Sequence, residues 1–255
     1  MERFAPPLLA RATHIRPGIA EFVPLPLVAG HVIFDLDGTL IDSAPICMTI
    51  LNMMLAERGS ARRVTRDDIA PLLSLGGERL IAETLAEDCG DIADELRHFR
   101  AQYATRATPA SCLYPGVRAG IKALHAAGFR LSVCSNKPQA LCDKTLNDLG
   151  LAPYVDFVVG GRADVAAKPA RAMIDLILSH HHVSAEKCLF VGDSGIDLST
   201  ARGVNMPFIY VTYGYDSQPM RANDVVRCDS FDGVVSRLFE LQLTDAPPVP
   251  DWWEA

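Results

Sequence analysis

The stretch best suited to chemistry is the sequence DLDGT at residues 35–39, which directly follows an apolar run at 32–34. Asp35 and Asp37 are two residues apart on an expected turn, so both carboxylates can face one pocket. This pattern suits phosphoryl transfer, in which one carboxylate attacks phosphorus while the other protonates the leaving oxygen and then activates water. Gly38 permits a tight turn that brings backbone N–H groups close to phosphate oxygens. The alternative for this motif alone is a turn that only ends a strand.

Other polar side chains follow later apolar runs. Ser135 and Asn136 come directly after the run at 131–134, and Lys168 precedes a proline. The Ser135 hydroxyl can bond a phosphoryl oxygen, with Asn136 beside it. Lys168 supplies a positive charge that can bind a phosphate dianion and offset nearby carboxylates. Each taken alone has a structural alternative, a turn serine or a surface lysine.

Two further carboxylates, Asp193 and Asp197, follow the apolar run at 189–192. Carboxylate oxygens are hard ligands that suit Mg²⁺. Together with Asp35 and Asp37 they would place four carboxylates near one point, where they would repel one another unless a cation lies among them. The sequence therefore predicts a Mg²⁺ site.

Short apolar runs bounded by turn residues predict the strands that position these groups. The runs lie at 32–34, 131–134, 157–159, 189–192 and 208–211. Helical patterns separate most of them, at 116–127, 138–149, 169–179 and 197–203. This alternation predicts an α/β fold, a Rossmann-like parallel sheet with helices on both faces. Ligands of such sheets bind beyond the carboxyl ends of the strands, where the polar residues above are placed.

Residues 46–112 interrupt the alternation, because they contain no convincing strand. Four helical patterns occupy this stretch, at 46–58, 67–74, 78–88 and 92–105. We therefore expect an all-α cap domain at 46–112, hinged near 43–46 and 110–115, standing over the strand ends of a core formed by 31–45 and 113–240.

The two ends of the chain are rich in proline. This composition predicts an N-terminal extension at residues 1–30 and a C-terminal tail at residues 241–255. The tail contains Trp252 and Trp253, which we expect to dock on the chain's own surface or on a partner.

Composition excludes several classes of protein. The 255 residues carry 24 Lys and Arg against 31 Asp and Glu, a net charge of −7, which disfavours a nucleic-acid partner. The seven cysteines form no C-x-x-C pair, which indicates a reducing compartment, the cytoplasm, rather than a zinc site or disulfides. No apolar run reaches the roughly 18 residues of a membrane helix, and no signal peptide is expected.

Four motifs occur in the order found in the haloacid-dehalogenase superfamily of phosphatases, which the sequence resembles over about residues 30–235. The first motif matches DLDGT at 35–39, and the second matches Ser135. The third matches Lys168 with its proline, and the fourth matches GDSGID at 192–197. The resemblance implies a Rossmann-like core with an inserted helical cap and a phosphatase activity.

The resemblance also implies a role for each matched residue. Asp35 would be the nucleophile that forms an aspartyl-phosphate, and Asp37 the general acid and then the base. The groups that would hold the phosphoryl group are Gly38, Thr39, Ser135, Asn136 and Lys168. Mg²⁺ would be held by a side-chain oxygen of Asp35, the backbone carbonyl of Asp37 and a carboxylate oxygen of Asp193, with Asp197 assisting directly or through water.

Several branches of the superfamily have features that this sequence lacks, or lack features that it has, and these differences exclude them. Dehalogenases lack the second aspartate, which is present as Asp37. The cap segment 46–112 has no lysine for the Schiff base of phosphonoacetaldehyde hydrolases. The hinge 42–46 lacks the His-Lys pair of β-phosphoglucomutases. The remaining branch, capped phosphatases, is most similar in the phosphoglycolate phosphatase group, through residues 114–117, 135–138 and 211–215.

The cap sequence LGGERL at 75–80 lies where that group has a glycine-containing substrate loop. We expect Gly76, Gly77 and Arg79 to hold a small carboxylate, by N–H groups at a helix start and by the guanidinium. The alternatives are a plain interhelical turn and a solvated arginine.

The expected function is thus Mg²⁺-dependent hydrolysis of a small phosphorylated metabolite, 2-phosphoglycolate in the first instance. Sugar phosphates, nucleotides and pyrophosphate remain alternative substrates, because related phosphatases share these motifs. A regulatory protein that binds phosphate without catalysis is the alternative from another class. Neither nucleic acid nor membrane is an expected partner, and monomer and homodimer are both open.

Overall fold

The structure is a computed structural model that describes residues 30–216 and 225–243. Most of the expected N-terminal extension and the tail with Trp252 and Trp253 lie outside the described residues.

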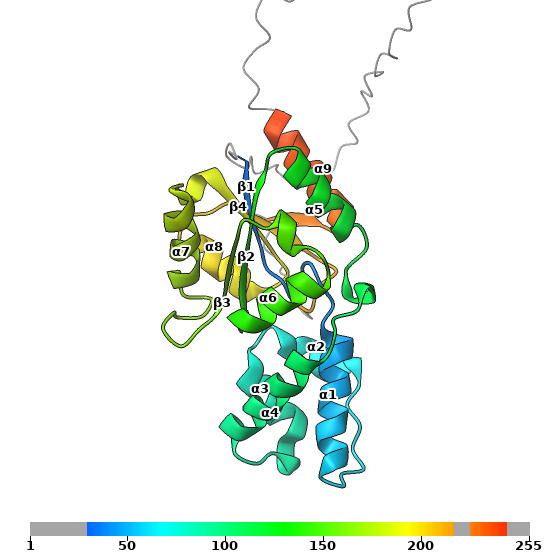
Figure 1. Ribbon diagram of the computed structural model, residues 1–255. Helices are drawn as coiled ribbons and strands as arrows, with labels where there is room; N and C mark the ends of the chain where they lie inside the picture. Colours follow the sequence, from blue (N-terminus) through cyan, green and yellow to red (C-terminus); the bar gives the residue numbers. More distant parts are fainter. Residues whose placement is uncertain (1–29, 217–224, 244–255) are drawn as a thin grey trace, which may run out of the picture.

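Six parallel strands form one sheet at the centre of the described core (Figure 1), in the order β3-β2-β1-β4-β5-β6. Their bounds are β1 His31–Phe34, β2 Arg130–Pro138, β3 Phe157–Gly161, β4 Cys188–Gly192, β5 Phe208–Val211 and β6 Val226–Cys228. The predicted parallel α/β sheet is confirmed. Strand β6 was not predicted, because its three residues, with Arg227 in the middle, do not form an apolar run.

Helices cover both faces of this sheet, since successive side chains of a strand point to opposite faces. Val32 and Phe34 of β1 pack in one apolar cluster with α5 (Val117–Ala126), α6 (Gln139–Asp148) and α9 (Phe231–Leu243). Ile33, between them, packs in the opposite cluster with α7 (Ala172–His181) and α8 (Gly195–Arg202). Figure 1 shows α7 and α8 on one side of the sheet and α5 and α9 on the other.

Four helices form a separate unit beyond the strand ends, the cap (Figure 1). They are α1 Ala44–Glu57, α2 Arg66–Leu73, α3 Gly77–Leu85 and α4 Ile92–Thr105. Their inward side chains share an apolar cluster, which includes Ile50, Leu80 and Phe99. The two segments that connect cap and core run side by side, because Asp42 N–H donates to the Cys112 carbonyl at 2.7 Å and Tyr114 N–H to the Leu40 carbonyl at 3.2 Å.

The strand order brings the ends of three strands together. β1 lies between β2 and β4, with Phe34 in register with Val133 and with Val191. Chain connections leave in opposite directions on the two sides of β1, which is the arrangement that opens a crevice for ligands at the carboxyl ends of the strands. Asp35 and Asp193 directly follow β1 and β4, and Ser135 lies in the carboxyl-terminal half of β2, so all three meet at the crevice.

Candidate active site

Asp35 and Lys168 form the centre of the site. The Lys168 ammonium donates to Asp35 Oδ1 at 2.8 Å, to Asp197 Oδ1 at 2.6 Å and to the Cys134 carbonyl at 2.9 Å. Asp35, Lys168 and Asp197 are all buried. Burial raises the pKa of Asp35 to about 7, against the opposing pull of Lys168. Burial also disfavours the Lys168 ammonium, but the carboxylates of Asp197 and Asp35 outweigh it and raise its pKa.

Asp193, whose carboxylate lies close to that of Asp35, is fully buried. Its Oδ2 accepts the Tyr215 N–H at 2.7 Å, and its Oδ1 accepts the Thr39 hydroxyl at 3.4 Å. Burial, followed by the charges of Asp197 and Asp35, raises the pKa of Asp193 well above its usual range. Such a carboxylate is ionised only if further positive charge is close to it.

The three carboxylates of Asp35, Asp193 and Asp197 can hold a metal ion, since their oxygens approach within 4.8 Å of one another. With all three carboxylates ionised, they and the Lys168 ammonium carry a net charge of −2. A divalent cation would balance this charge, and an all-oxygen donor set suits Mg²⁺. The residues therefore fit the predicted metal, with the side chain of Asp37 outside the cluster.

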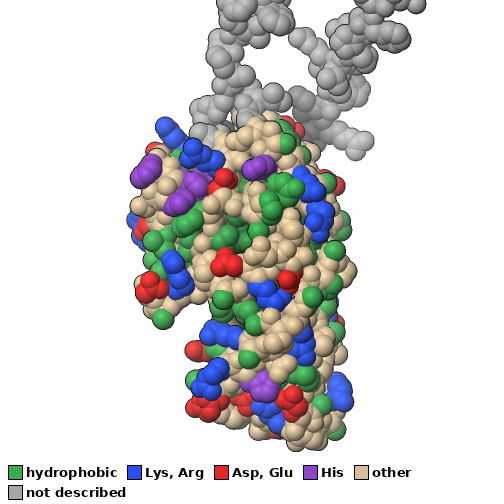
Figure 2. All heavy atoms as spheres, in the orientation of Figure 1, with side chains coloured by type: hydrophobic (Ala, Val, Ile, Leu, Met, Phe, Trp, Pro, Cys, Tyr) green, Lys and Arg blue, Asp and Glu red, His purple; other side chains and the backbone are tan. Residues whose placement is uncertain are grey.

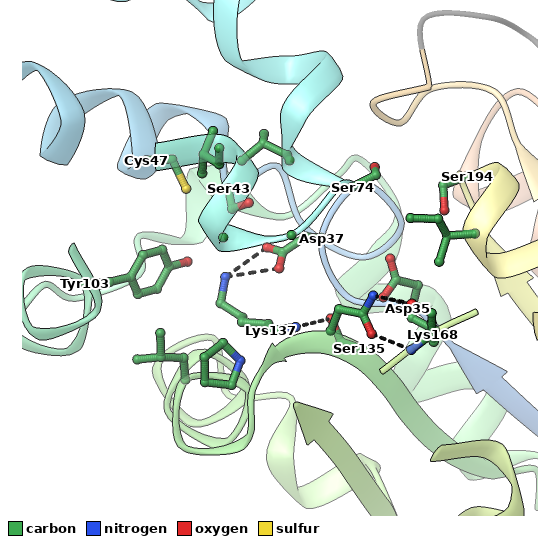
Figure 3. A pocket seen from close by; sticks show the side chains of 18 of the residues that line it. Asp35, Asp37, Ser43, Cys47, Ser74, Tyr103, Ser135, Lys137, Lys168 and Ser194 are labelled. Atoms are coloured by element: carbon green, nitrogen blue, oxygen red, sulfur yellow. Dashed lines mark hydrogen bonds and ion pairs between the residues drawn. The ribbon is translucent and has the colours of Figure 1, made fainter. Parts of the chain in front are cut away.

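Asp37 is held by a residue to which the sequence assigned no role. The Lys137 ammonium donates to both oxygens of Asp37, at 3.0 and 3.1 Å, and lies 4.2 Å from the centre of the Tyr103 ring (Figure 3). Burial disfavours the charged Lys137, yet Asp37 and then Tyr103 raise its pKa well above the usual value. One signal was available: Lys137 directly follows Ser135 and Asn136 at a strand end and is one of five lysines in the chain.

Ser135 and Asn136 both border the cavity above Asp35. The two polar atoms of the Asn136 side chain are both engaged with the backbone of Lys168. Its amide donates to the Lys168 carbonyl at 3.0 Å, and its oxygen accepts the Lys168 N–H at 2.8 Å. In this geometry the Asn136 side chain positions Lys168, whereas the Ser135 hydroxyl is the group available to a ligand.

Gly38 and Thr39 pack on Asp193 rather than line the cavity. Gly38 has φ +87°, and a Cβ there would overlap the Asp193 carboxylate. Gly214 approaches the same carboxylate, and Gly192 approaches Asp197 in the same way. Residues 192 and 214 stand within sequences noted for the family resemblance, but their packing role depends on the fold and was not predicted.

A cavity of about 110 Å³ lies between the core and the cap, and Figure 3 shows the side chains around it. The core lines it with Asp35, Asp37, Ser135, Asn136, Lys137, Lys168 and Asp197. The cap lines it with Cys47, Leu73, Ser74, Gly76, Gly77, Leu80, Leu96, Phe99, Arg100 and Tyr103. The site residues predicted from the four motifs thus lie in or directly behind one cavity.

The structure places two of the three predicted cap residues at the cavity wall and the third outside it. Gly76 and Gly77 border the cavity; Gly76 has φ +96°, and a Cβ on Gly77 would press on Leu96, so both also have a structural reason to be glycine. Arg79 is absent from the cavity wall, has a side chain 60% exposed and pairs with Glu83 at 2.5 Å. Arg100, to which the sequence assigned no role, borders the cavity instead.

Tyr215 connects the metal cluster to the hinge of the cap. Its backbone N–H donates to Asp193, and its hydroxyl donates to Asp42 Oδ1 at 2.9 Å. The same hydroxyl oxygen accepts the backbone N–H groups of Ser43, at 2.6 Å, and Ala44, at 3.2 Å, where α1 begins. One residue of the core therefore contacts both a candidate metal ligand and the first residues of the cap.

Comparison with known proteins gives relatives that match most of the chain. A phosphoglycolate phosphatase of Rhodospirillum rubrum is 36% identical over 206 residues, covering 74% of this chain and 82% of the relative. One of Nitrosospira multiformis is 34% identical over 223 residues, covering 85% and 95%. Among solved structures, CbbY of Rhodobacter sphaeroides with bound phosphate has a TM-score of 0.66 at 25% identity, covering 79% of this chain and 94% of that one.

A family model for haloacid dehalogenase-like hydrolases matches residues 32–211, from the first residues of β1 to the end of β5. The match includes both aspartates of the first motif, the lysine at 168 and the acidic pair after β4. This chain belongs to the haloacid dehalogenase-like hydrolase family.

Proposed function

We propose that the protein is a phosphatase that hydrolyses a small phosphate monoester through an aspartyl-phosphate on Asp35. The observation that carries the proposal is the placement of two carboxylates of one turn at one cavity. Asp35 is paired with Lys168 within the three-carboxylate cluster, and Asp37 is paired with Lys137 at the cavity wall.

Each residue of the proposed site has its own role in the reaction. The Asp35 carboxylate attacks phosphorus, the P–O bond to the substrate breaks, and Asp37 gives a proton to the leaving oxygen. Asp37 then takes a proton from the water that attacks the aspartyl-phosphate, so that phosphate leaves and Asp35 is restored. Lys168 and the Ser135 hydroxyl bind the phosphoryl oxygens, and Asn136 fixes the backbone of Lys168.

The metal that we propose is Mg²⁺, held by Asp35, Asp193 and Asp197 with the backbone carbonyl of Asp37. It would neutralise charge on the transferring phosphoryl group and orient that group for in-line attack. The Gly38 turn keeps the backbone of the first motif against Asp193, and Tyr215 holds Asp193 from the other side.

The substrate that we propose is 2-phosphoglycolate. The relatives that match 74–85% of the chain are phosphoglycolate phosphatases, which supports this choice. Sugar phosphates are the second candidate, because CbbY has been solved with xylulose-1,5-bisphosphate. Nucleotides, pyrophosphate and a non-catalytic phosphate-binding role are further alternatives.

We place the enzyme in the cytoplasm. All seven cysteines lie in the described part of the chain and are free thiols, which suits a reducing compartment. Within the described ranges, no helix combines the length and apolar character needed to cross a membrane.

A phosphate-release assay tests the proposal. The purified protein is given Mg²⁺ and 2-phosphoglycolate, p-nitrophenyl phosphate, sugar phosphates, nucleoside monophosphates or pyrophosphate, with EDTA as the metal control. We expect release from 2-phosphoglycolate to exceed release from the others and to stop in EDTA. Asp35→Asn should lower turnover on the order of 10³-fold or more, while Asp164→Asn, at a side chain 79% exposed, should not. Absence of release from every compound would favour the phosphate-binding alternative.

The role of Asp37 has a separate test. Asp37→Asn should lower turnover of 2-phosphoglycolate by about 10²–10⁴-fold, because an alkoxide leaves poorly without a proton. With p-nitrophenyl phosphate the leaving phenolate needs no proton. The variant should therefore release a burst of p-nitrophenol equal to the enzyme concentration and then stall at the aspartyl-phosphate. Wild-type rates with both compounds would remove the acid–base role from Asp37.

A further inference from the structure

We infer that Arg100 of α4 binds the carboxylate of the substrate and that the site selects phosphate monoesters whose far end is a single carboxylate. This inference rests on the proposed phosphatase function and adds to it the residue that sets substrate choice. It transfers the carboxylate-binding role from Arg79, which the sequence favoured, to a residue at the cavity wall.

The other arginines of the cap already have protein partners. Arg58, Arg62, Arg66, Arg79 and Arg97 pair with carboxylates, and Arg63 and Arg106 donate to carbonyl oxygens. Among the described residues Arg100 alone of these eight has neither a hydrogen bond nor an ion pair. It is also the only one of them that borders the cavity. A guanidinium without a partner presents its donors to whatever enters, and its planar fork matches a carboxylate.

The two lysines on the core side of the cavity are already paired with carboxylates of the protein. Lys168 donates to Asp35 and Asp197, and Lys137 donates to Asp37. Three lining carboxylates therefore offset these two lysines. A substrate that carries a carboxylate in addition to its phosphate needs a further cation, and in the described part of the cavity wall that cation is Arg100.

The cap wall around Arg100 is mostly apolar. Leu73, Leu80, Leu96 and Phe99 form most of it. Besides Arg100, the polar side chains that the cap and its hinge contribute to the cavity are Ser43, Cys47, Ser74 and Tyr103. Arg100 is itself exposed to solvent, like Arg79, and apolar surroundings strengthen its attraction for a carboxylate only where the bound ligand excludes water. They also offer few hydrogen-bond partners to the hydroxyl groups of a sugar, which would be desolvated without compensation. The wall thus fits a short acid better than a polyhydroxyl chain.

The test compares a charged substrate with its neutral counterpart. 2-Phosphoglycolate and 2-phosphoglycolamide differ only in a carboxylate replaced by a carboxamide of similar size. We expect the wild type to prefer the acid. Arg100→Ala should lower kcat/KM for the acid about 10- to 100-fold, mainly through KM, and change kcat/KM for the amide less than about twofold. Arg100→Lys should retain part of the preference, because it keeps the charge but not the fork.

Two matched controls come from the same domain. Arg97→Ala removes a guanidinium from the same helix that is paired with Asp94, and Arg79→Ala removes the one paired with Glu83. Both should keep the wild-type preference for the acid. A fall for acid and amide alike in Arg100→Ala, or loss of the preference in Arg79→Ala instead, would overturn the assignment to Arg100.

The outcomes separate this inference from the proposed substrate. Preference for another carboxylated monoester, such as 3-phosphoglycerate, that disappears in Arg100→Ala would keep the role of Arg100 and reject 2-phosphoglycolate. Hydrolysis of p-nitrophenyl phosphate or sugar phosphates but of no carboxylated monoester would reject both and keep the phosphatase. An acid preference that Arg100→Ala retains would reject Arg100 alone.

Discussion

At the scale of single residues, the site depends on backbone that packs directly on carboxylates. Gly38 and Gly214 both approach Asp193 so closely that a methyl group on either would overlap it. Asp193 in turn has no solvent exposure and little freedom to move. The position of Asp193, a candidate metal ligand, therefore depends on Gly38 and Gly214 having no side chains.

Gly38→Ala should show this dependence. Alanine would be strained at φ +87° and would also displace the Asp193 carboxylate. Gly128→Ala is a matched control, because Gly128 has φ +88° and no atom outside residues 127–129 lies within 4 Å of the position that a methyl group would take. Backbone strain should cost both variants about 1 kcal/mol of stability, and the overlap with Asp193 should cost Gly38→Ala about 1–3 kcal/mol more. Only Gly38→Ala should lose turnover, by about 100-fold, because small displacements at a reacting centre are costly. Thermal unfolding and phosphate release measure the two effects, and equal turnover in both variants would contradict the dependence.

The residues of the site that could be predicted are those whose type indicates chemistry next to an apolar run. Asp35, Asp37 and Lys168 belong to this group, and the structure brings them to one cavity. Lys137 and Arg100 could not be assigned, because the function of a lysine or arginine depends on which carboxylates reach it. Arg79 and Arg100 are both arginines of predicted cap helices, and only the fold shows which one faces the cavity.

At the scale of elements, the loop after β5 connects core and cap. Tyr213 and Tyr215 both leave β5 toward the first motif, and their hydroxyl groups take different partners. Tyr213 donates to the Thr39 carbonyl within the core at 2.9 Å. The Tyr215 hydroxyl contacts Asp42, Ser43 and Ala44 at the hinge, and Asp42 pairs with Arg66 of α2 at 2.5 Å.

Tyr215→Phe should therefore loosen the start of α1. Without the hydroxyl, the Ser43 N–H loses its side-chain acceptor and the Ala44 N–H keeps only Asp42 Oδ1, at 3.2 Å, which should cost about 1–2 kcal/mol. Hydrogen exchange of the amides at 43–47 should become faster in Tyr215→Phe. Tyr213→Phe, which removes a hydroxyl from the same loop, should leave these amides unchanged. Equal protection at 43–47 in both variants would show that the hinge does not depend on the Tyr215 hydroxyl.

The elements themselves were largely predictable from the sequence. Five buried strands were visible as apolar runs, because both faces of a parallel strand are covered. Strand β6 leaves little pattern because it has only three residues, with Arg227 in the middle, whereas β3 at the other edge of the sheet contains the apolar run at 157–159. Strand order could not be predicted from the chain, since it depends on packing between segments as distant as β1 and β4.

At the scale of the whole molecule, the two ends of the sheet have different chemistry. The carboxyl ends of the strands hold the acidic cluster, and Figure 2 shows histidines gathered at the end of the core away from the cap. There His31, the first residue of β1, bonds Ser132 of β2 at 3.0 Å, and Ser132 bonds His181 of α7 at 3.2 Å. The His31 and His181 rings meet edge to face, with centres 4.3 Å apart.

This histidine contact makes the stability of the fold depend on pH. Burial first, and then the proximity of His181, lower the pKa of His31 from 6.5 to about 4, with Asp156 and Arg130 nearby acting in opposite directions. Above about pH 6.5, His31 is neutral in both the folded and the unfolded chain, and its full contribution to stability is present. As the pH falls toward 4, the unfolded chain binds a proton that the folded chain does not, so the free energy of unfolding falls, by at most about 3 kcal/mol.

His31→Gln should reduce this dependence, because glutamine keeps a polar group for Ser132 but does not titrate. The measurement is the free energy of urea unfolding at intervals between pH 7 and pH 4.5, in EDTA so that metal binding does not contribute. Carboxylates also titrate in this range, so the informative quantity is the difference in slope between variant and wild type. His125→Gln, at an exposed position on α5, should leave the wild-type slope unchanged. A slope in His31→Gln as steep as that of the wild type would mean that the acid sensitivity arises at a group other than His31. The carboxylate cluster at the opposite end of the sheet is not such a source, because the raised pKa values of Asp35 and Asp193 make the folded chain bind protons first and stabilise it as the pH falls.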